Sequence, residues 1–240
     1  KNPVTQTTSA YFEPVQDYVI TKIPRWNFAK FPGSDHRLGL QMKSVGEAMG
    51  IGRSFLESLQ KACQSLEIDR NGLESNGHEL QTLDELKKSL REPSWDRLFH
   101  IKEAFNLGMT MKTIQELTRI DRWYLLQIQQ LVKLEHEVKR YTIDNITREL
   151  MMEMKRNGFS DVQLGRLMGC SEDDVYERRK EMGVTRSYKM VDTCSAEFPS
   201  PTNYFYSSFE DENESVRSDK KKVIVLGAGP NRIGQGIEFD

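Results

Sequence analysis

A glycine-rich stretch near the end of the sequence contains the residues whose types and spacing could do chemistry. Four apolar residues, Val223–Leu226, are followed by four glycines and one arginine: Gly227, Gly229, Arg232, Gly234 and Gly236. Glycine lets the backbone approach a phosphate closely at the carboxyl end of a strand, and an arginine there could contact an anion. A tight strand-to-helix turn without a ligand explains the same spacing and stays open as an alternative.

The stretch does not meet the dinucleotide-binding fingerprint, because the third glycine of that pattern would fall at Arg232. This spacing disfavours a nicotinamide site, whereas an independent nucleotide-binding module remains an alternative. A single apolar strand also needs parallel neighbours that return through crossover helices. We therefore expect a piece of a longer enzyme, cut just inside its next domain. Val223–Leu226 would then be disordered or docked on a neighbouring molecule.

Composition excludes several classes of protein. The 240 residues have a formal net charge of −2, so no net positive field attracts nucleic acid. Three cysteines far apart predict no disulfide framework and a reducing cytoplasm. No apolar run approaches the roughly 20 residues that cross a bilayer, and the first residues do not resemble a signal peptide. We expect a cytoplasmic chain with neither a membrane nor nucleic acid as partner.

The remaining reactive residue types form no catalytic or metal-binding set. The four histidines stand apart from any cysteine or carboxylate at metal-ligand spacing. Cys63 lies on the apolar face of a predicted helix, which favours a core residue over a nucleophile. The sequence thus predicts no catalytic residue, no metal ligand and no cofactor in this chain.

The first 68 residues mix strand and helix patterns. The β-branched and aromatic run Gln16–Ile23 predicts a strand that stops at Pro24, and Met42–Ile51 predicts a second one. Ser54 and Glu57 have the spacing of a capping box, in which each side chain binds the backbone N–H of the other residue. Two strands and one helix do not close a core, so this segment is expected to be incomplete.

The next segment predicts one helix after another. Predicted starts fall at capping residues, and predicted ends at a proline or at glycines followed by apolar residues. The starts are Thr82, Ser94, Thr110, Asp121, Asn145, Ser160 and Ser171, and the ends include Pro93, Gly108, Gly158, Gly169 and Gly183. A weak repeat with an offset of 50 residues aligns Ile114 with Leu164 and Leu125 with Val175, which suggests two similar helix-turn-helix units.

Such units raise the alternative of a helix-turn-helix DNA-binding domain. The candidate recognition helix, however, opens with Glu172, Asp173 and Asp174, which is the wrong charge beside phosphates. In the other unit Trp123 stands near the helix start, where it either packs in the core or forms a subunit contact.

An aromatic stretch, 187–209, with Pro199 and Pro201 predicts an extended strap that fills seams of the helical domain. Residues 210–222 carry an acidic run followed by a basic run, which is typical of a solvated linker.

Several longer motifs resemble those of one enzyme family, the carbamoyl phosphate synthetase large subunit. Phe12–Pro14, Thr21–Arg25 and Lys43–Glu47 resemble the end of its first ATP-grasp half. Gly229–Asp240 is similar to the opening of its second half, and Val191–Phe198 resembles the strap between them.

The resemblance implies a parent enzyme that makes carbamoyl phosphate from bicarbonate, ammonia from glutamine and two ATP, with Mg or Mn, for arginine and pyrimidine synthesis. It implies as partners the rest of the large subunit, a glutaminase subunit or domain, and further copies in a homo-oligomer. By the same resemblance, Arg232 would lie beside the internal path that carries the carbamate intermediate between the halves. The ATP and metal ligands would belong to other parts of the parent.

These observations predict a mainly α fold: a compact multi-helix oligomerisation domain with incomplete α/β remnants at both ends. The expected division is 1–68 for the remnant of the first half, 69–210 for the helical domain including the strap, and 211–240 for a linker and the start of the second half. The fragment is expected to be inactive alone and to position the two synthetase halves.

Overall fold

The computed structural model describes residues 1–3, 5–28, 31–74, 82–199 and 202–226. Within these ranges the chain forms eight helices and two small antiparallel sheets, so the prediction of a mainly α fold is confirmed. In chain order the elements are β1 (Val19–Trp26), β2 (Ser44–Gly52), α1 (Phe55–Gln64), α2 (Leu83–Arg91), α3 (Arg97–Asn106), α4 (Met111–Thr118), α5 (Arg122–Val138), α6 (Arg148–Arg156), α7 (Asp161–Met168), α8 (Glu172–Glu181), β3 (Ser187–Met190) and β4 (Phe205–Ser208).

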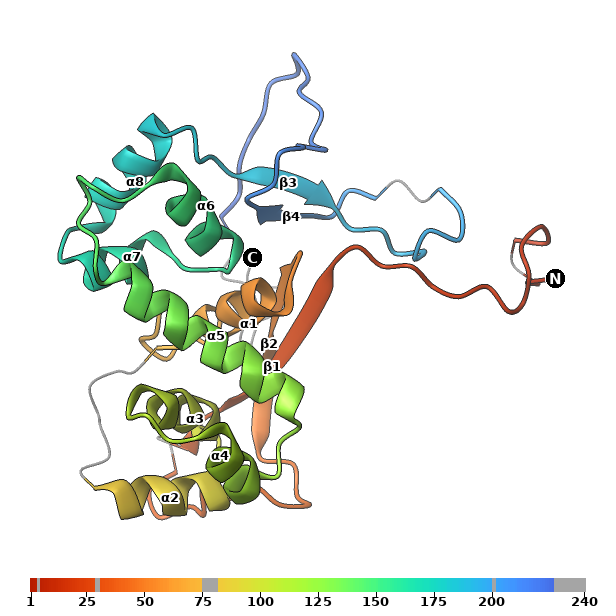
Figure 1. Cartoon of the computed structure of the whole chain (residues 1–240). Coiled ribbons are helices and arrows are strands. Elements are labelled where there is room, and N and C mark those ends of the chain that lie inside the picture. The colour runs from red at the N-terminus through yellow and green to blue at the C-terminus, as the bar shows by residue number, and fades with distance from the viewer. Residues whose placement is uncertain (4, 29–30, 75–81, 200–201, 227–240) are drawn as a thin grey trace.

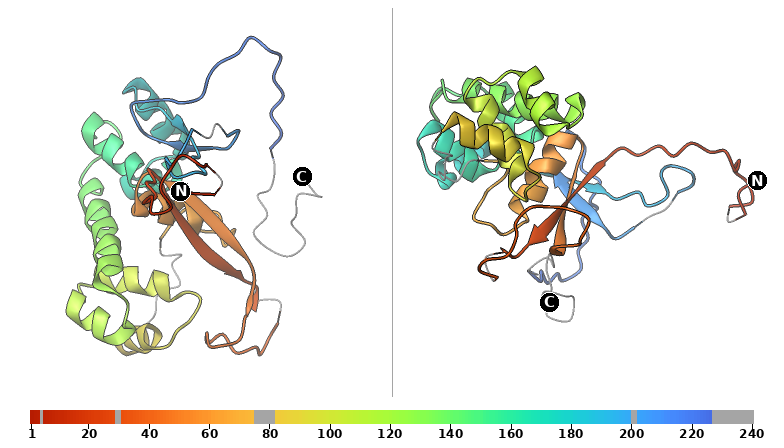
Figure 2. Two further views of the ribbon diagram at one scale, coloured as in Figure 1. Left: turned by 90° about the vertical axis from the view of Figure 1, so that its right-hand side faces the viewer. Right: turned by 90° about the horizontal axis from the view of Figure 1, so that it is seen from below.

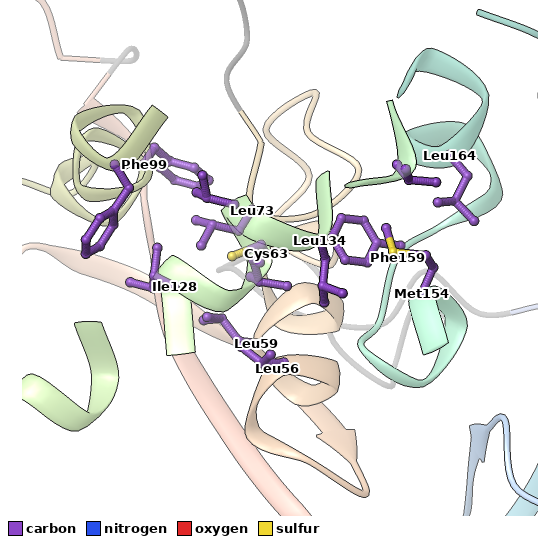
Figure 3. Packing of buried hydrophobic residues seen from close by; sticks show 14 of the residues in the cluster. Leu56, Leu59, Cys63, Leu73, Phe99, Ile128, Leu134, Met154, Phe159 and Leu164 are labelled. Atoms are coloured by element: carbon purple, nitrogen blue, oxygen red, sulfur yellow. The ribbon is translucent and has the colours of Figure 1, made fainter. Parts of the chain in front are cut away.

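The long helix α5 connects two groups of helices, α2–α4 at one end and α6–α8 at the other (Figures 1 and 2). Helix α1 lies between α5 and the β1–β2 sheet, and the β3–β4 hairpin lies beside the same sheet, next to α6 (Figure 1). The hydrophobic core follows this arrangement. Figure 3 shows it running from Leu56 and Leu59 of α1, past Ile128 and Leu134 of α5, to Phe159 after α6. One continuous core therefore joins α1 to both groups of helices.

The strand β1 has the predicted length but lies three residues further along the chain than the predicted strand Gln16–Ile23. It pairs with β2 from Val19 opposite Gly52 to Trp26 opposite Ser44, and Pro24 lies inside the strand, opposite Glu47. The prediction that Pro24 ends the strand is therefore wrong. In a two-stranded sheet each strand has a free edge, and a proline is tolerated there because an N–H facing that edge makes no ladder hydrogen bond.

Small residues on β2 allow α1 to pack directly on the sheet. Ala48, Gly50 and Gly52 are the buried positions of β2. A Cβ atom built on Gly50 would lie 2.1 Å from the carbonyl oxygen of Ser58 and 2.7 Å from the backbone nitrogen of Ala62. The backbones of strand and helix thus approach so closely that no side chain fits between them.

Most of the predicted helix starts are confirmed. Thr82, Thr110, Asp121, Ser160 and Ser171 each accept a hydrogen bond from a backbone N–H of the first turn, and the last two form complete capping boxes. Ser54 also caps α1, but the carboxylate of Glu57 binds the N–H of Arg53 instead of that of Ser54.

Two predicted starts are displaced. The first turn of α3 begins after Asp96, and the hydroxyl of Ser94 instead donates to the Asp96 carboxylate at 2.6 Å. Helix α6 begins after Thr147, whose side chain accepts from the N–H of Leu150. Asn145 closes a preceding turn by accepting from the N–H of Thr142. Asparagine favours such turns as much as helix caps, which explains the two-residue error.

The predicted glycine helix ends are confirmed. Gly158, Gly169 and Gly183 have φ values of 83°, 75° and 70°, which are left-handed. The apolar residue after each glycine donates its N–H five residues back: Phe159 to Met154, Cys170 to Gly165 and Val184 to Arg179. These are Schellman endings. The residues aligned by the 50-residue repeat are buried alike, since Ile114, Leu164, Leu125 and Val175 are all fully buried.

The predicted extended strap is a β-hairpin. Ser187 pairs with Ser208 and Met190 with Phe205, because the two ends of the stretch supply each other's backbone partners. Tyr206 and Phe209 are buried, in agreement with the predicted seam filling, whereas Tyr188 and Tyr204 are exposed. Val223–Leu226 lies outside any strand of the described chain, and its side chains are exposed. No helix in the described ranges is long and apolar enough to span a membrane.

The close approach of α1 to the sheet generates a prediction. Gly50→Ala should lower the free energy of unfolding by about 3 kcal/mol, because the added methyl group collides with helix backbone that cannot rotate away. Chemical denaturation followed by circular dichroism measures the change. The control is Gly39→Ala, an exposed site where a Cβ meets no atom within 4 Å. Equal stability of the two variants would contradict the packing described above.

Candidate functional site

The residues that the sequence singled out for chemistry, Arg232 and the glycines at 227, 229, 234 and 236, lie outside the described residues. Within the described ranges, a candidate site lies where β2, α1, the α6–α7 turn and β4 meet. A cavity of about 390 Å³ opens there, between elements that lie side by side in Figure 1. Its charged lining residues are Glu57, Lys61, Lys155, Asp161, Glu172 and Arg186.

Glu57 and Lys61 form the first charged group of this site. The Glu57 side chain is almost completely buried. One carboxylate oxygen accepts from the backbone N–H of Arg53 at 2.7 Å and from the Ser208 hydroxyl at 3.2 Å. The other oxygen lies 2.8 Å from the ammonium of Lys61, one helical turn away. A buried carboxylate at the start of α1 thus binds both the β2–α1 turn and strand β4.

The Lys61 ammonium donates to the carbonyl of Ile51 in β2 at 2.8 Å and to the carbonyl of Ser207 in β4. It also forms an ion pair with Glu57. Burial lowers the pKa of Lys61, and the negative charge of Glu57 opposes that shift. Through these three contacts the lysine joins β2, β4 and its own helix.

A second buried charge group lies on the opposite wall, in the α6–α7 turn. Lys155 donates to the carbonyl of Phe159 at 2.6 Å and to Asp161 at 2.7 Å. The other Asp161 oxygen accepts from the guanidinium of Arg179 at 2.9 Å, and Arg179 also donates to the carbonyl of Val184. Asp161 therefore links the end of α6 to helix α8.

Burial and neighbouring charges shift the pKa values of Lys155 and Asp161. Burial lowers the pKa of Lys155 to about 8, against the attraction of Asp161. Burial also raises the pKa of Asp161, but Lys155 and Arg179 outweigh that effect and hold it below its usual value. Lys155 therefore stays mostly protonated at neutral pH, and Asp161 stays ionised.

The aromatic ring of Phe209 lies between these charges and the hairpin. The ammonium of Lys155 is 5.0 Å from the ring centroid, and the guanidinium of Arg179 is 5.7 Å from it. Arg156 donates to the carbonyl of Phe209 at 2.9 Å and pairs with Glu210 and Asp211. The residues directly after β4 are thus bound to α6, while β4 itself is bound to α1.

Other reactive residue types in the described ranges serve packing. Burial raises the pKa of the Cys63 thiol to about 12, so it carries no thiolate near neutral pH, as expected of a core residue. No group of three or more His, Cys, Asp or Glu side chains that could hold a metal ion occurs among the described residues. The arrangement of the site is therefore suited to fixing segments relative to one another.

Sequence reasoning did not identify this site. From the sequence Glu57 is predicted only as a capping residue, and no sequence pattern groups Lys155, Asp161 and Arg179. One available signal was the spacing of Glu57 and Lys61, which are four residues apart beside an apolar helix face. The Ser208 contact lies 151 residues away, and no local pattern reveals it.

The Asp161 group generates a pH prediction. Because its pKa is lower in the folded than in the unfolded state, Asp161 stabilises the fold above about pH 4, and this stabilisation is lost as the pH falls through its folded pKa. Asp161→Asn should lower the free energy of unfolding by about 3 kcal/mol at pH 7, since it leaves two buried cations unpaired. The deficit should shrink toward pH 3.

Urea denaturation between pH 7 and pH 3 measures both effects. Asp219→Asn, at an exposed position, is the control and should leave the stability unchanged. A deficit that is the same at both pH values would show that Asp161 does not titrate as described.

Known proteins match this chain over its whole length. The family model described as "Carbamoyl-phosphate synthetase large chain, oligomerisation domain" matches residues 47–183. Relatives named carbamoyl phosphate synthase large chain are 49% identical over 244 residues in Archaeoglobus fulgidus and 51% identical over 241 residues in Nostoc sp.. In Pseudomonas aeruginosa the identity is 49% over 237 residues.

The alignments cover 100%, 100% and 97% of this chain but only 22–23% of those relatives, so the chain spans less than a quarter of their length. The alternative of a DNA-binding domain receives no support from these matches, and α8 presents three acidic residues in its first turn. With the match over more than half of its residues, the chain belongs to the carbamoyl phosphate synthetase large chain family and contains its oligomerisation domain.

Proposed function

We propose that the chain is the central segment of the large chain of a glutamine-hydrolysing carbamoyl phosphate synthase, an ATP-dependent ligase. In this proposal the segment has no catalytic activity alone and holds the two synthetase halves in place. The observation that carries it is the set of contacts at and beside the cavity, where charged side chains of α1 and α6 bind β2, β4 and the residue after β4. Such an arrangement fixes the direction in which the chain enters and leaves the helical domain.

The proposed division into 1–68, 69–210 and 211–240 fits this role. The first and second parts are packed through α1, whose buried side chains belong to the core of the helical part. Rigid packing of this kind would let a labile intermediate pass between two active centres without meeting water.

The proposed parent uses ATP with Mg or Mn and receives ammonia from a glutaminase subunit or domain. It works in the cytoplasm, in arginine and pyrimidine biosynthesis. Arg232 and the glycine-rich stretch would belong to the second half, with Arg232 beside the path of the carbamate. These assignments rest on the family resemblance and on the names of the relatives.

We also propose that the segment self-associates through an aromatic cluster on α5. The ring of Trp123 is 5.1 Å from that of Phe55 and 5.0 Å from that of Tyr124. Trp123 and Tyr124 remain 49% and 48% exposed, and the neighbouring Leu126 is also exposed. Adjacent exposed aromatic residues are typical of protein interfaces, which supports this surface as the subunit contact.

Both parts of the proposal can be tested on the purified 240-residue chain. It should form no carbamoyl phosphate from bicarbonate, glutamine or ammonia, and ATP.

Sedimentation velocity at several concentrations should show self-association of the chain. Trp123→Ala should weaken this self-association by about tenfold or more, as for an aromatic interface residue. Leu107→Ala, at an exposed apolar residue outside the cluster, is the control. Carbamoyl phosphate formation by the chain would contradict the proposed lack of activity. A strict monomer at every concentration would contradict the proposed self-association.

A further inference from the structure

The β3–β4 hairpin has little stability of its own. Its two strands are four residues each, and they form a separate two-stranded sheet. An isolated hairpin of this size is at best marginally stable in water. Its position must therefore come from contacts with the rest of the fold.

Those contacts come from two sides of the cavity. On one side, α1 binds β4 through the two charged side chains described above, Glu57 to the hydroxyl of Ser208 and Lys61 to the carbonyl of Ser207. On the other side, α6 binds the next residues through Arg156, which donates to the carbonyl of Phe209. The chain that leaves β4 is thus bound to the first segment and to the helical domain within three consecutive residues.

The Glu57 contact depends on the negative charge of the carboxylate. Its carboxylate balances Lys61 and accepts the bonds from Arg53 and Ser208 at the same time. A glutamine has the same shape, but it brings one donor group into a site where every neighbour is a donor. Replacing the carboxylate by an amide should therefore weaken the attachment of the hairpin without creating a cavity.

We infer that Glu57 and Lys61 are positioning residues that anchor β4 to α1 and so fix the point from which the chain continues toward the following synthetase half. This inference rests on the proposed function. A carbamate that must cross between the halves is lost to hydrolysis when they are misaligned. The attachment of β4 by Glu57 and Lys61 is therefore expected to control the coupling of the two ATP-using steps, while each step keeps its own activity.

The test uses the full-length large chain with its glutaminase, and compares Glu57→Gln with Glu135→Gln. Glu135 is also a buried carboxylate paired with a lysine, but its partner Lys102 joins α3, α5 and the loop at Leu73, away from the hairpin. The two variants make the same chemical change in carboxylates of similar burial. Only one of the pairs contacts β4.

For Glu57→Gln, the ratio of ATP hydrolysed to carbamoyl phosphate formed should rise roughly twofold or more, since misplacement by about 1 Å is enough to impair transfer. Bicarbonate-dependent ATP hydrolysis should keep its rate. Amide hydrogen exchange in 205–208 should accelerate by about tenfold, because the anchored strand opens more often. Glu135→Gln should leave both the ratio and the exchange in 205–208 at the wild-type values.

A second variant, Ser208→Ala, covers the case in which Glu57→Gln fails to fold. It removes only the hydroxyl that binds Glu57 and should change the ratio and the exchange in the same direction. An unchanged ratio in both variants would overturn the inference, as would an equal rise in Glu135→Gln. Failure of the wild-type large chain to make any carbamoyl phosphate would instead overturn the proposed function, and the exchange rates would still decide whether Glu57 holds the hairpin.

Discussion

The structure depends on the burial of α1 between the sheet and α5. The small residues of β2 bring the sheet into direct contact with the helix, and α5 covers the other side, so even the polar residues Glu57, Ser58 and Gln60 lose contact with water. Each must then find a partner in the fold, because an unpaired buried polar group costs about 1–3 kcal/mol. Ser58 contacts Thr21 of β1 at 2.7 Å, and Gln60 accepts from the N–H of Leu73 at 2.6 Å. Glu57 binds the hairpin.

Through these partners, α1 determines where three distant segments lie. An apolar helix could slide or rotate between its neighbours at little cost, since apolar contacts are not directional. Hydrogen bonds to buried partners permit one position only. The buried ion pairs act in the same way: Lys102 with Glu135 fixes α3 on α5, and Asp161 fixes α6 relative to α8. Such pairs contribute more to the choice of arrangement than to net stability.

The features that could be predicted from the sequence are those that depend on neighbouring residues. Capping side chains and left-handed glycines act within four or five residues, so most of the predicted helix starts and ends agree with the structure. The prediction fails where two candidate caps stand close together, as at Asn145 and Thr147. The hairpin and the charged site depend on residues far apart in the chain. Gln163, for example, approaches Gln60 across 103 residues. Local patterns cannot specify such pairs, because burial and partner are both decided by tertiary packing.

The contacts between α1 and the β3–β4 hairpin form a joint, and their dependence on buried partners also determines how this joint responds to force. A small displacement of the hairpin would leave the buried Glu57 carboxylate and the Lys61 ammonium without their β4 partners. The energy would therefore rise steeply over the length of one hydrogen bond, and the hairpin would be either bound or released, with no stable position between. A joint with that property holds its neighbours in register until it opens completely. Rigid spacing, as opposed to gradual bending, is the behaviour that the proposed transfer of a short-lived intermediate between two active centres would require.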